Sequence, residues 1–173
     1  LMENLVNTGH HLLYDLAARG LDSDSYRCRA ALEILSRRFT RDRECLDSGP
    51  LELPGFPVFR CRSKRGDRDY LSFLAVVPVK KLQKLLSQLR VALSKPEWRA
   101  EEIAPEVIIL VPTEGTEQEV LEALQDTELP ACWVAVGVLQ ADGEDRFYTF
   151  HHDTEGTWRE DMDRRGFNPR IWR

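Results

Sequence analysis

The sequence lacks the short motifs that mark phosphate-binding enzymes. Neither GxxxxGK[ST] nor GxGxxG occurs among the 173 residues, and these are the patterns in which glycine-rich loops hold phosphate groups. The loop from Thr113 to Thr116 follows an apolar run and precedes a capped helix, which is where open α/β sheets bind ligands. It contains one glycine and the acidic Glu114. We therefore interpret it as an ordinary connection and expect no cofactor.

The sequence also lacks ligand pairs with the spacing that metal sites commonly use. No two cysteines form a CxxC pair, which is the spacing that structural zinc sites commonly use. The histidines come as two adjacent pairs, and adjacent side chains point in different directions on a helix or a strand. We therefore expect no metal site. In the absence of any sign of an oxidising compartment, we also expect reduced, mostly buried thiols at Cys28, Cys45, Cys61 and Cys132.

Long apolar segments are missing as well. No run approaches the roughly 18–20 residues that a membrane-spanning helix needs. The N-terminus has neither a cationic start nor the apolar run of a secretory signal. The sequence therefore predicts an intracellular location, cytoplasm or nucleus, without membrane contact. With 42% hydrophobic and 31% charged residues, the composition is that of a globular domain that is large enough to bury a core.

Charge is present but unevenly divided. Residues 27–98 contain 16 basic and 8 acidic side chains, whereas residues 99–173 contain 7 basic and 17 acidic ones. The formal net charge of −5 therefore conceals a basic middle and an acidic end. Such asymmetry bears on partners more than on fold.

Hydrophobic periodicity indicates two helices at the N-terminus and a sheet after them. Apolar residues recur at helical spacing in both helices. A polar stretch from Thr40 to Gly55 separates this helical pair from the sheet and reads as a loop. Beyond it, continuously apolar, β-branched runs predict strands that are buried on both faces. The predicted helices are Glu3–Arg19, Asp22–Phe39, Val79–Leu93 and Thr116–Asp126, and the predicted strands are Phe56–Arg62, Tyr70–Val77, Val107–Val111, Trp133–Leu139 and Arg146–His151.

From Leu51 onward the predicted order is β-β-α-β-α-β-β. Alternation of strands with helices predicts an α/β fold, with α+β as the alternative, in which the N-terminal helical pair packs on a mixed, partly parallel sheet. We expect Val107–Val111 and Trp133–Leu139 to be neighbouring central strands beneath Leu86 and Leu89. The sequence divides into an N-terminal helical segment (1–45), a mixed α/β core (51–155) and a C-terminal tail (156–173).

Basic residues gather around the first predicted hairpin and at the start of the helix that follows it. Together they are candidates for a phosphate-contacting surface, and a solvated or partner-facing surface is the alternative. Because no base-reading motif occurs, any such contact should be weak, salt-sensitive and independent of base sequence. The candidate residues are Arg60, Arg62, Lys64, Arg65, Lys80, Lys81 and Lys84.

The C-terminal tail combines large apolar side chains with many charges. Trp and Arg are favoured where protein interfaces concentrate their binding energy. Gly166 and Pro169 interrupt any helix there, so we expect an extended segment, with the sheet already complete by His151. The tail either folds back on its own core or anchors a partner through Trp158, Phe167, Ile171 and Trp172.

The helix–hairpin–helix–strand order resembles the restriction-endonuclease-like fold. The stretch WVAVGVLQADGEDRFYTFHHD resembles the end of structural subunits of tRNA-splicing endonucleases. The hairpin that would supply the acidic-x-Lys triplet of a nuclease reads RDYLSFLAVV, and its carboxylates are not spaced to hold a metal. The resemblance therefore implies an inactive version of the fold, with no catalytic residues.

Two non-enzymatic functions are compatible with these patterns, and an enzyme with a non-obvious site is the third, less favoured possibility. The first is a non-enzymatic interaction or assembly domain, a subunit or fragment of a larger complex, which binds a protein partner or forms a homo-oligomer. The second is a nucleic-acid-binding accessory domain with an inactive nuclease-like fold.

Overall fold

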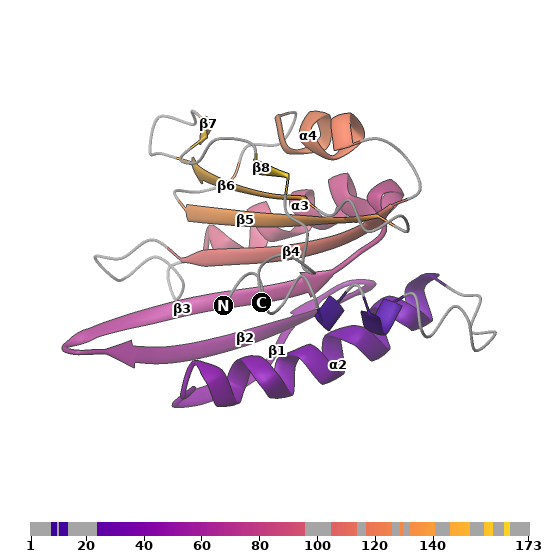
Figure 1. Cartoon of the computed structure of the whole chain (residues 1–173). Helices are drawn as coiled ribbons and strands as arrows, with labels where there is room; N and C mark the ends of the chain where they lie inside the picture. The colour runs from indigo at the N-terminus through magenta and orange to yellow at the C-terminus, as the bar shows by residue number, and fades with distance from the viewer. Residues whose placement is uncertain are drawn as a thin grey trace.

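A computed structural model places an eight-stranded sheet at the centre of the chain (Figure 1). It describes residues 8–9, 11–13, 24–95, 105–113, 117–125, 129, 132–140, 146–152, 158–160 and 165–166. The strands lie in the order β1-β2-β3-β4-β5-β6-β7, and β8 also pairs with β6. The labelled elements are α2 (Asp24–Asp42), β1 (Asp47–Leu53), β2 (Phe56–Arg65), β3 (Arg68–Val76), α3 (Val79–Leu93), β4 (Glu106–Thr113), α4 (Glu117–Gln125), β5 (Cys132–Gln140), β6 (Arg146–His152), β7 (Trp158–Glu160) and β8 (Arg165–Gly166).

The centre of the sheet is parallel and its borders are antiparallel. β3, β4 and β5 pair in parallel, while β1, β2, β6, β7 and β8 pair antiparallel with their neighbours. Parallel strands read as continuous apolar runs because helices cover both of their faces. The predicted α/β class with a mixed, partly parallel sheet is confirmed, as is the pairing of the two most apolar strands, β4 and β5.

Helices cover the two faces of the sheet with separate apolar clusters. α3 and α4 bury Leu86, Leu89 and Val120 against Val107 and Ile109, together with the inward residues of β5. The stripe of leucines in α3 faces the sheet because its members recur every three or four residues. The predicted packing of Leu86 and Leu89 over β4 and β5 is therefore confirmed.

The opposite face is covered by α2 and by the helical residues 8–9 and 11–13. α2 buries Leu32, Leu35 and Phe39 against Leu74 and Ile108 of the sheet. In Figure 1, α2 lies in front of the sheet and α3 behind it. We call these two sides the α2 face and the α3 face.

A glycine brings the N-terminal helical residues close to the sheet. A Cβ atom added at Gly9 would lie 2.9 Å from Leu110 Cδ1 and 3.4 Å from Leu139 Cδ1. Nearby, Arg38 Nη1 of α2 donates a hydrogen bond to Thr8 Oγ1 at 3.1 Å. The described part of the predicted first helix thus packs on the α2 face, beside α2. The rest of that predicted helix lies outside the described residues.

Two boundaries of the predicted sheet were wrong. The stretch from Asp47 to Leu53, expected within a loop, is the edge strand β1, which pairs with β2 along its whole length. Its composition hid it, because Gly49, Pro50 and three polar side chains lower its strand propensity. The sheet is also not complete by His151, since β7 and β8 both pair with β6. Residues 158–160 and 165–166 of the predicted tail therefore belong to the sheet.

Candidate functional site

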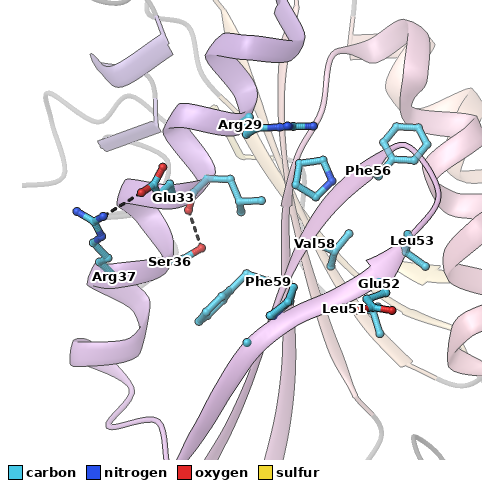
Figure 2. A pocket seen from close by; sticks show the side chains of 14 residues that line it. Arg29, Glu33, Ser36, Arg37, Leu51, Glu52, Leu53, Phe56, Val58 and Phe59 are labelled. Carbon is cyan, nitrogen blue, oxygen red and sulfur yellow. Dashed lines mark hydrogen bonds and ion pairs between the residues drawn. The ribbon is translucent and has the colours of Figure 1, made fainter.

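A groove opens between α2 and the β1–β2 hairpin (Figure 2). α2 packs against β2 and β3 and leaves the outer hairpin partly uncovered. The helix contributes one stripe of side chains to the groove, spaced by three or four residues, and the hairpin contributes its apolar residues. The space measures about 590 Å³. Its lining residues include Leu32 and Ser36 on α2 and Pro57, Val58 and Phe59 on β2.

The charges around this groove are few and balanced. Arg37 Nη2 and Glu33 Oε1 form an ion pair of 2.9 Å on the exposed side of α2. Arg29 lies at one end of the groove, and Figure 2 shows its side chain extended from α2 toward the hairpin. Glu52 stands on the β1 side. The interior between them is apolar, so the groove suits a ligand that inserts apolar side chains and presents few charges.

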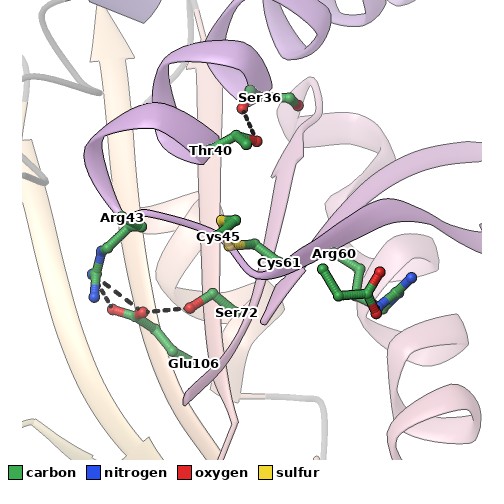
Figure 3. The surroundings of a disulfide bond; sticks show 9 residues. Ser36, Thr40, Arg43, Cys45, Arg60, Cys61, Ser72 and Glu106 are labelled. Carbon is green, nitrogen blue, oxygen red and sulfur yellow. Dashed lines mark hydrogen bonds and ion pairs between the residues drawn. A yellow bond between two sulfur atoms is a disulfide. The ribbon is translucent and has the colours of Figure 1, made fainter. Parts of the chain in front are cut away.

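The wall of the α2 face next to this groove contains a disulfide. Cys45, in the connection between α2 and β1, is bonded to Cys61 in the middle of β2 (Figure 3), with a Cα–Cα distance of 5.9 Å. That spacing lies within the range that disulfides require. The expectation of four reduced thiols was therefore wrong for this pair. The sequence separation of 16 residues gave no signal, because β1 folds the chain back and brings the two residues together.

The other two cysteines, Cys28 and Cys132, are outside the disulfide and buried. Burial raises the pKa of the Cys132 thiol to about 12, because the thiolate would lose its hydration inside the apolar α3-face cluster. Only the thiolate is a good nucleophile. Cys132 is therefore unreactive at neutral pH, as expected for a thiol that fills the core.

A polar network lies close to the disulfide, beneath the C-terminal end of α2. Glu106, the first residue of β4, accepts a hydrogen bond from Ser72 Oγ at 3.0 Å. Arg43 Nη2 forms an ion pair with Glu106 Oε2 at 3.4 Å, and its guanidinium also lies 5.4 Å from the centre of the Phe39 ring. Figure 3 shows Arg43, Ser72 and Glu106 converging from the turn after α2, from β3 and from β4. The network fixes the end of α2 over the start of the parallel strands.

Two of the predicted nucleic-acid-binding residues on β2 are engaged with carboxylates. Arg60 Nη1 lies 2.8 Å from Asp47 Oδ2, and Arg62 Nη2 lies 3.3 Å from Asp69 Oδ2. Arg60 lowers the pKa of the Asp47 carboxyl below its ordinary value, first through its hydrogen bond and then through its positive charge. A phosphate would have to compete with these carboxylates for Arg60 and Arg62.

The remaining basic candidates lie at two distant ends of the hairpin. Lys64 and Arg65 are at its tip, where Lys64 pairs with Asp69. Lys80, Lys81 and Lys84 begin α3, just after β3 ends at Val76. From Asp69 to Val76 the strand extends about 23 Å at roughly 3.3 Å per residue. The seven predicted residues therefore form two separate groups along the hairpin.

The predicted partner-binding residues are only partly described. Trp158 is the first residue of β7 and pairs with His152 of β6. Phe167, Ile171 and Trp172 lie outside the described residues. The backbone at Trp158 thus belongs to the sheet. For this short segment, that arrangement corresponds to the alternative in which the tail folds back on its own core.

Other candidate chemistry is limited within the described part of the chain. There, no group of three His, Cys, Asp or Glu side chains lies close enough to hold a metal ion. Among the described helices, none is both long and apolar enough to cross a membrane. His10 and residues 114–116, in the loop that we interpreted as an ordinary connection, lie outside the described residues.

Sequence reasoning missed the groove. Its walls come from α2 and from β1, and β1 was assigned to a loop. The signal that could have revealed it is the pair of prolines, Pro50 and Pro57, which oppose Phe59 and Glu52 in the register of an edge hairpin. Proline in a sheet is confined to edges and bulges, so the two prolines indicate an exposed border.

Comparison with known proteins gives a likeness of fold. No family model matches the chain, and no curated protein matches it. Among solved structures, it is similar to the crystal structure of the central domain of yeast acetyl-CoA carboxylase, with 15% identity and a TM-score of 0.55. The match covers 91% of this chain and 29% of that chain, so this chain spans less than a third of the matched structure. At this identity the similarity concerns the fold alone.

Proposed function

We propose that the chain is a non-enzymatic interaction or assembly domain, a part of a larger complex, and that the groove between α2 and the β1–β2 hairpin receives its protein partner. The single observation that carries this proposal is the apolar lining of an open space of about 590 Å³. Apolar surface left in contact with water is unfavourable, so a concave space with an apolar lining favours a ligand that covers it.

The hairpin favours insertion of side chains over addition of a strand. β1 is an edge strand, but Pro50 at its centre has no N–H to offer a neighbouring strand. Asp47 and Glu52 add charge to the same strand, which further discourages strand pairing. A partner segment would therefore bind by placing apolar side chains against Leu32 and Phe59, while Arg29 and Glu52 meet charges at its ends.

The test is a charge placed inside the groove. Pro57→Lys introduces an ammonium group among the lining residues and breaks no backbone hydrogen bond, because proline has no N–H to donate. Val91→Lys is the matched control, since Val91 is exposed on α3. In capture from native extract, we expect the wild type and the control to retain the same protein partner. We expect Pro57→Lys to lose it, with an unchanged melting temperature.

Nuclease treatment of the extract separates this function from the alternative. Protein assembly predicts that capture survives the treatment. Capture that disappears with nuclease, or that Pro57→Lys leaves undiminished, would contradict the proposal. A second copy of the chain as occupant would give a mass that rises with concentration in light scattering.

The alternative function is a nucleic-acid-binding accessory domain. Its predicted surface, the basic hairpin and the start of α3, is divided into the two groups described above, and reversing Lys64 and Arg65 to Glu is the direct test of the hairpin group. The intracellular location also stays a prediction. The Cys45–Cys61 disulfide bears on it, because reducing compartments rarely preserve such bonds.

A further inference from the structure

The Cys45–Cys61 disulfide closes the open end of the β1–β2 hairpin. At the closed end, β1 and β2 are joined between Leu53 and Phe56, which are partners in the register. At the other end, Cys45 precedes the first residue of β1 by two positions and is bonded across to β2. The ring of chain that this bond closes therefore includes the whole of β1.

Apart from this bond, β1 is weakly held. It is an edge strand with β2 as its neighbour, and of its seven residues Leu51 alone is buried. Pro50 has no N–H to donate, and Gly49 loses more conformational freedom on folding than other residues do. Elements with few buried apolar contacts and exposed backbone hydrogen bonds open most easily in a native protein. The β1 side of the groove therefore depends on the disulfide, whereas α2 is held by its apolar stripe.

The groove needs β1 to keep its shape, because residues 49–53 form part of its lining. Pro50 lies opposite Phe59 in the register. The Phe59 ring in turn meets the Phe39 ring of α2 edge to face, with 6.4 Å between the ring centres. Phe59 and Cys61 lie on the same face of β2, because they are two positions apart. The disulfide thus lies where β1, β2 and α2 meet, next to a side chain that lines the groove.

One cysteine of the disulfide is accessible to a reductant. Cys45 is partly exposed, whereas Cys61 is fully buried. A thiolate of a dithiol attacks Cys45 Sγ and breaks the S–S bond, and Cys61 leaves as a thiolate that takes up a proton. The second thiol of the reductant then displaces Cys45 from the mixed disulfide. The protein has gained two electrons and two protons, and the dithiol has become a disulfide.

The consequences of reduction stay local to the hairpin. The ion pair of 3.4 Å between Arg43 and Glu106 holds the chain just before Cys45 and does not depend on the disulfide. α2 also keeps its apolar contacts with the sheet. β1 therefore loses its cross-link while the rest of the α2 face stays in place. Disulfides with this accessibility are the labile and regulatory ones, and in reducing compartments they are mostly redox-sensing.

From this arrangement we infer that the Cys45–Cys61 pair is a redox switch of the groove. In the oxidised protein, the bond holds β1 against β2 and the groove is complete. Reduction by a dithiol lets β1 separate from β2, so that the groove loses part of its lining and releases its occupant. The release of a protein partner rests on the proposed function of the groove, whereas the release of β1 does not.

The test measures backbone hydrogen exchange by mass spectrometry, with and without dithiothreitol. A cross-link that encloses about 15 residues shifts the unfolding equilibrium by roughly 100-fold. Because α2 still anchors the chain before Cys45, part of that restriction persists after reduction. Exchange in residues 47–53 should therefore become about 10- to 100-fold faster. Exchange in β4 should stay unchanged.

Two variants serve as controls. Cys45→Ala/Cys61→Ala should exchange at the rate of the reduced wild type in both conditions. Cys132→Ala removes a buried cysteine outside the disulfide and should respond to dithiothreitol as the wild type does. Alkylation of the denatured protein should show that Cys45 and Cys61 react only after reduction. The inference is overturned if these cysteines react without reduction, or if exchange in residues 47–53 is the same in both conditions. It is also overturned if β4 exchanges faster to the same extent, because reduction then unfolds the whole domain.

Partner capture separates this switch from the function on which its use depends. The wild type should retain its partner when oxidised and lose it when reduced, and Cys45→Ala/Cys61→Ala should fail to retain it without any reductant. Retention by that variant, although its β1 exchanges rapidly, would overturn the switch as a control of binding. If Pro57→Lys keeps the partner as well, the proposed function of the groove fails, and the exchange rates alone then decide whether reduction releases β1.

Discussion

The α3 face and the α2 face of the sheet are built from the same strands but from different side chains. Under α3 and α4, the buried residues are almost wholly apolar, from Leu51 on one edge strand to Val138 on β5. Under α2, the apolar cluster stops at the row where Ser72, Glu106 and Arg43 meet. On this face the disulfide, the groove and the exposed Trp133 all occur. The α3 face is closed by apolar packing, whereas the α2 face adds specific bonds to its apolar cluster and leaves part of its surface accessible.

The two faces of one sheet are therefore stabilised in different ways. Apolar burial is non-directional and scales with area, so a closed face stabilises the domain without selecting any ligand. The polar network and the disulfide hold particular residues in place, even where the neighbouring surface stays accessible to solvent. We expect substitutions on the α3 face to affect stability, and substitutions at the open parts of the α2 face to affect binding.

The strongest test of this difference is Ile109→Asp. Ile109 is fully buried in β4 on the α3 face, where a carboxylate has no partner and its burial costs several kcal/mol. The variant should be unfolded by circular dichroism. Trp133→Asp, on the other face of the neighbouring strand, should retain the wild-type spectrum. A folded Ile109→Asp variant would show that the α3 face is not closed.

Reduction of the disulfide should have the next largest effect. A cross-link that encloses about 15 residues stabilises a protein by about 3 kcal/mol, by restricting the unfolded chain. Urea denaturation with and without dithiothreitol should therefore differ by about that amount. A Cys45→Ala/Cys61→Ala variant should be insensitive to dithiothreitol. Equal midpoints for the wild type in both conditions would mean that the α2 face does not depend on this bond.

The ion pair of the polar network should contribute less. The Arg43 side chain is 12% exposed and that of Glu106 is 32% exposed, so Glu106→Gln removes a counter-charge from a largely buried guanidinium. We expect a loss of about 1–2 kcal/mol in the free energy of unfolding.

Glu33→Gln is the matched control for that substitution. Its partner Arg37 is 76% exposed, and such surface pairs contribute about 0.5 kcal/mol or less. If the two substitutions cost the same in urea denaturation, the network on the α2 face is no more than a surface contact.

The closed face could be predicted from the sequence, and the open face could not. The apolar periods of β4, β5 and α3 indicated neighbouring strands beneath Leu86 and Leu89, because burial on both sides leaves a signature in each strand. β1 left no such signature. Its seven residues are mostly exposed. They are held in the sheet by hydrogen bonds to β2, and the local sequence of β1 does not reveal this pairing.

The candidate sites were hidden for a related reason. The disulfide and the groove each join segments that are separate in the chain, and their geometry follows from strand register. Trp133 lies inside a correctly predicted strand, yet the apolar run around it gave no sign that this one position is exposed. The basic residues of the hairpin were conspicuous in the sequence, but Asp47 and Asp69 pair with two of them in the fold.

The smallest expected effect is a gain of stability where the α2 face meets its disulfide. Glu44 follows α2 with a φ of 51°, in the left-handed region that favours glycine. The Glu44 N–H bonds the Arg41 carbonyl at 3.3 Å, and the Cys45 N–H bonds the Thr40 carbonyl at 3.0 Å. This pair of bonds defines the helix ending in which glycine usually occupies the position of Glu44. A side chain there costs about 1 kcal/mol or more.

Glu44→Gly should therefore raise the free energy of unfolding by up to about 1 kcal/mol, offset in part by the greater freedom of glycine in the unfolded chain. Glu52→Gly, in the edge strand β1, is the control and should destabilise instead, because the backbone there is already extended and gains nothing from glycine. Both variants can be compared by urea denaturation in the oxidised and the reduced protein. If Glu44→Gly stabilises only the oxidised form, the disulfide holds the backbone at Glu44 in the left-handed conformation. Equal gains in both forms would assign that conformation to the helix ending itself, and a loss would contradict the prediction.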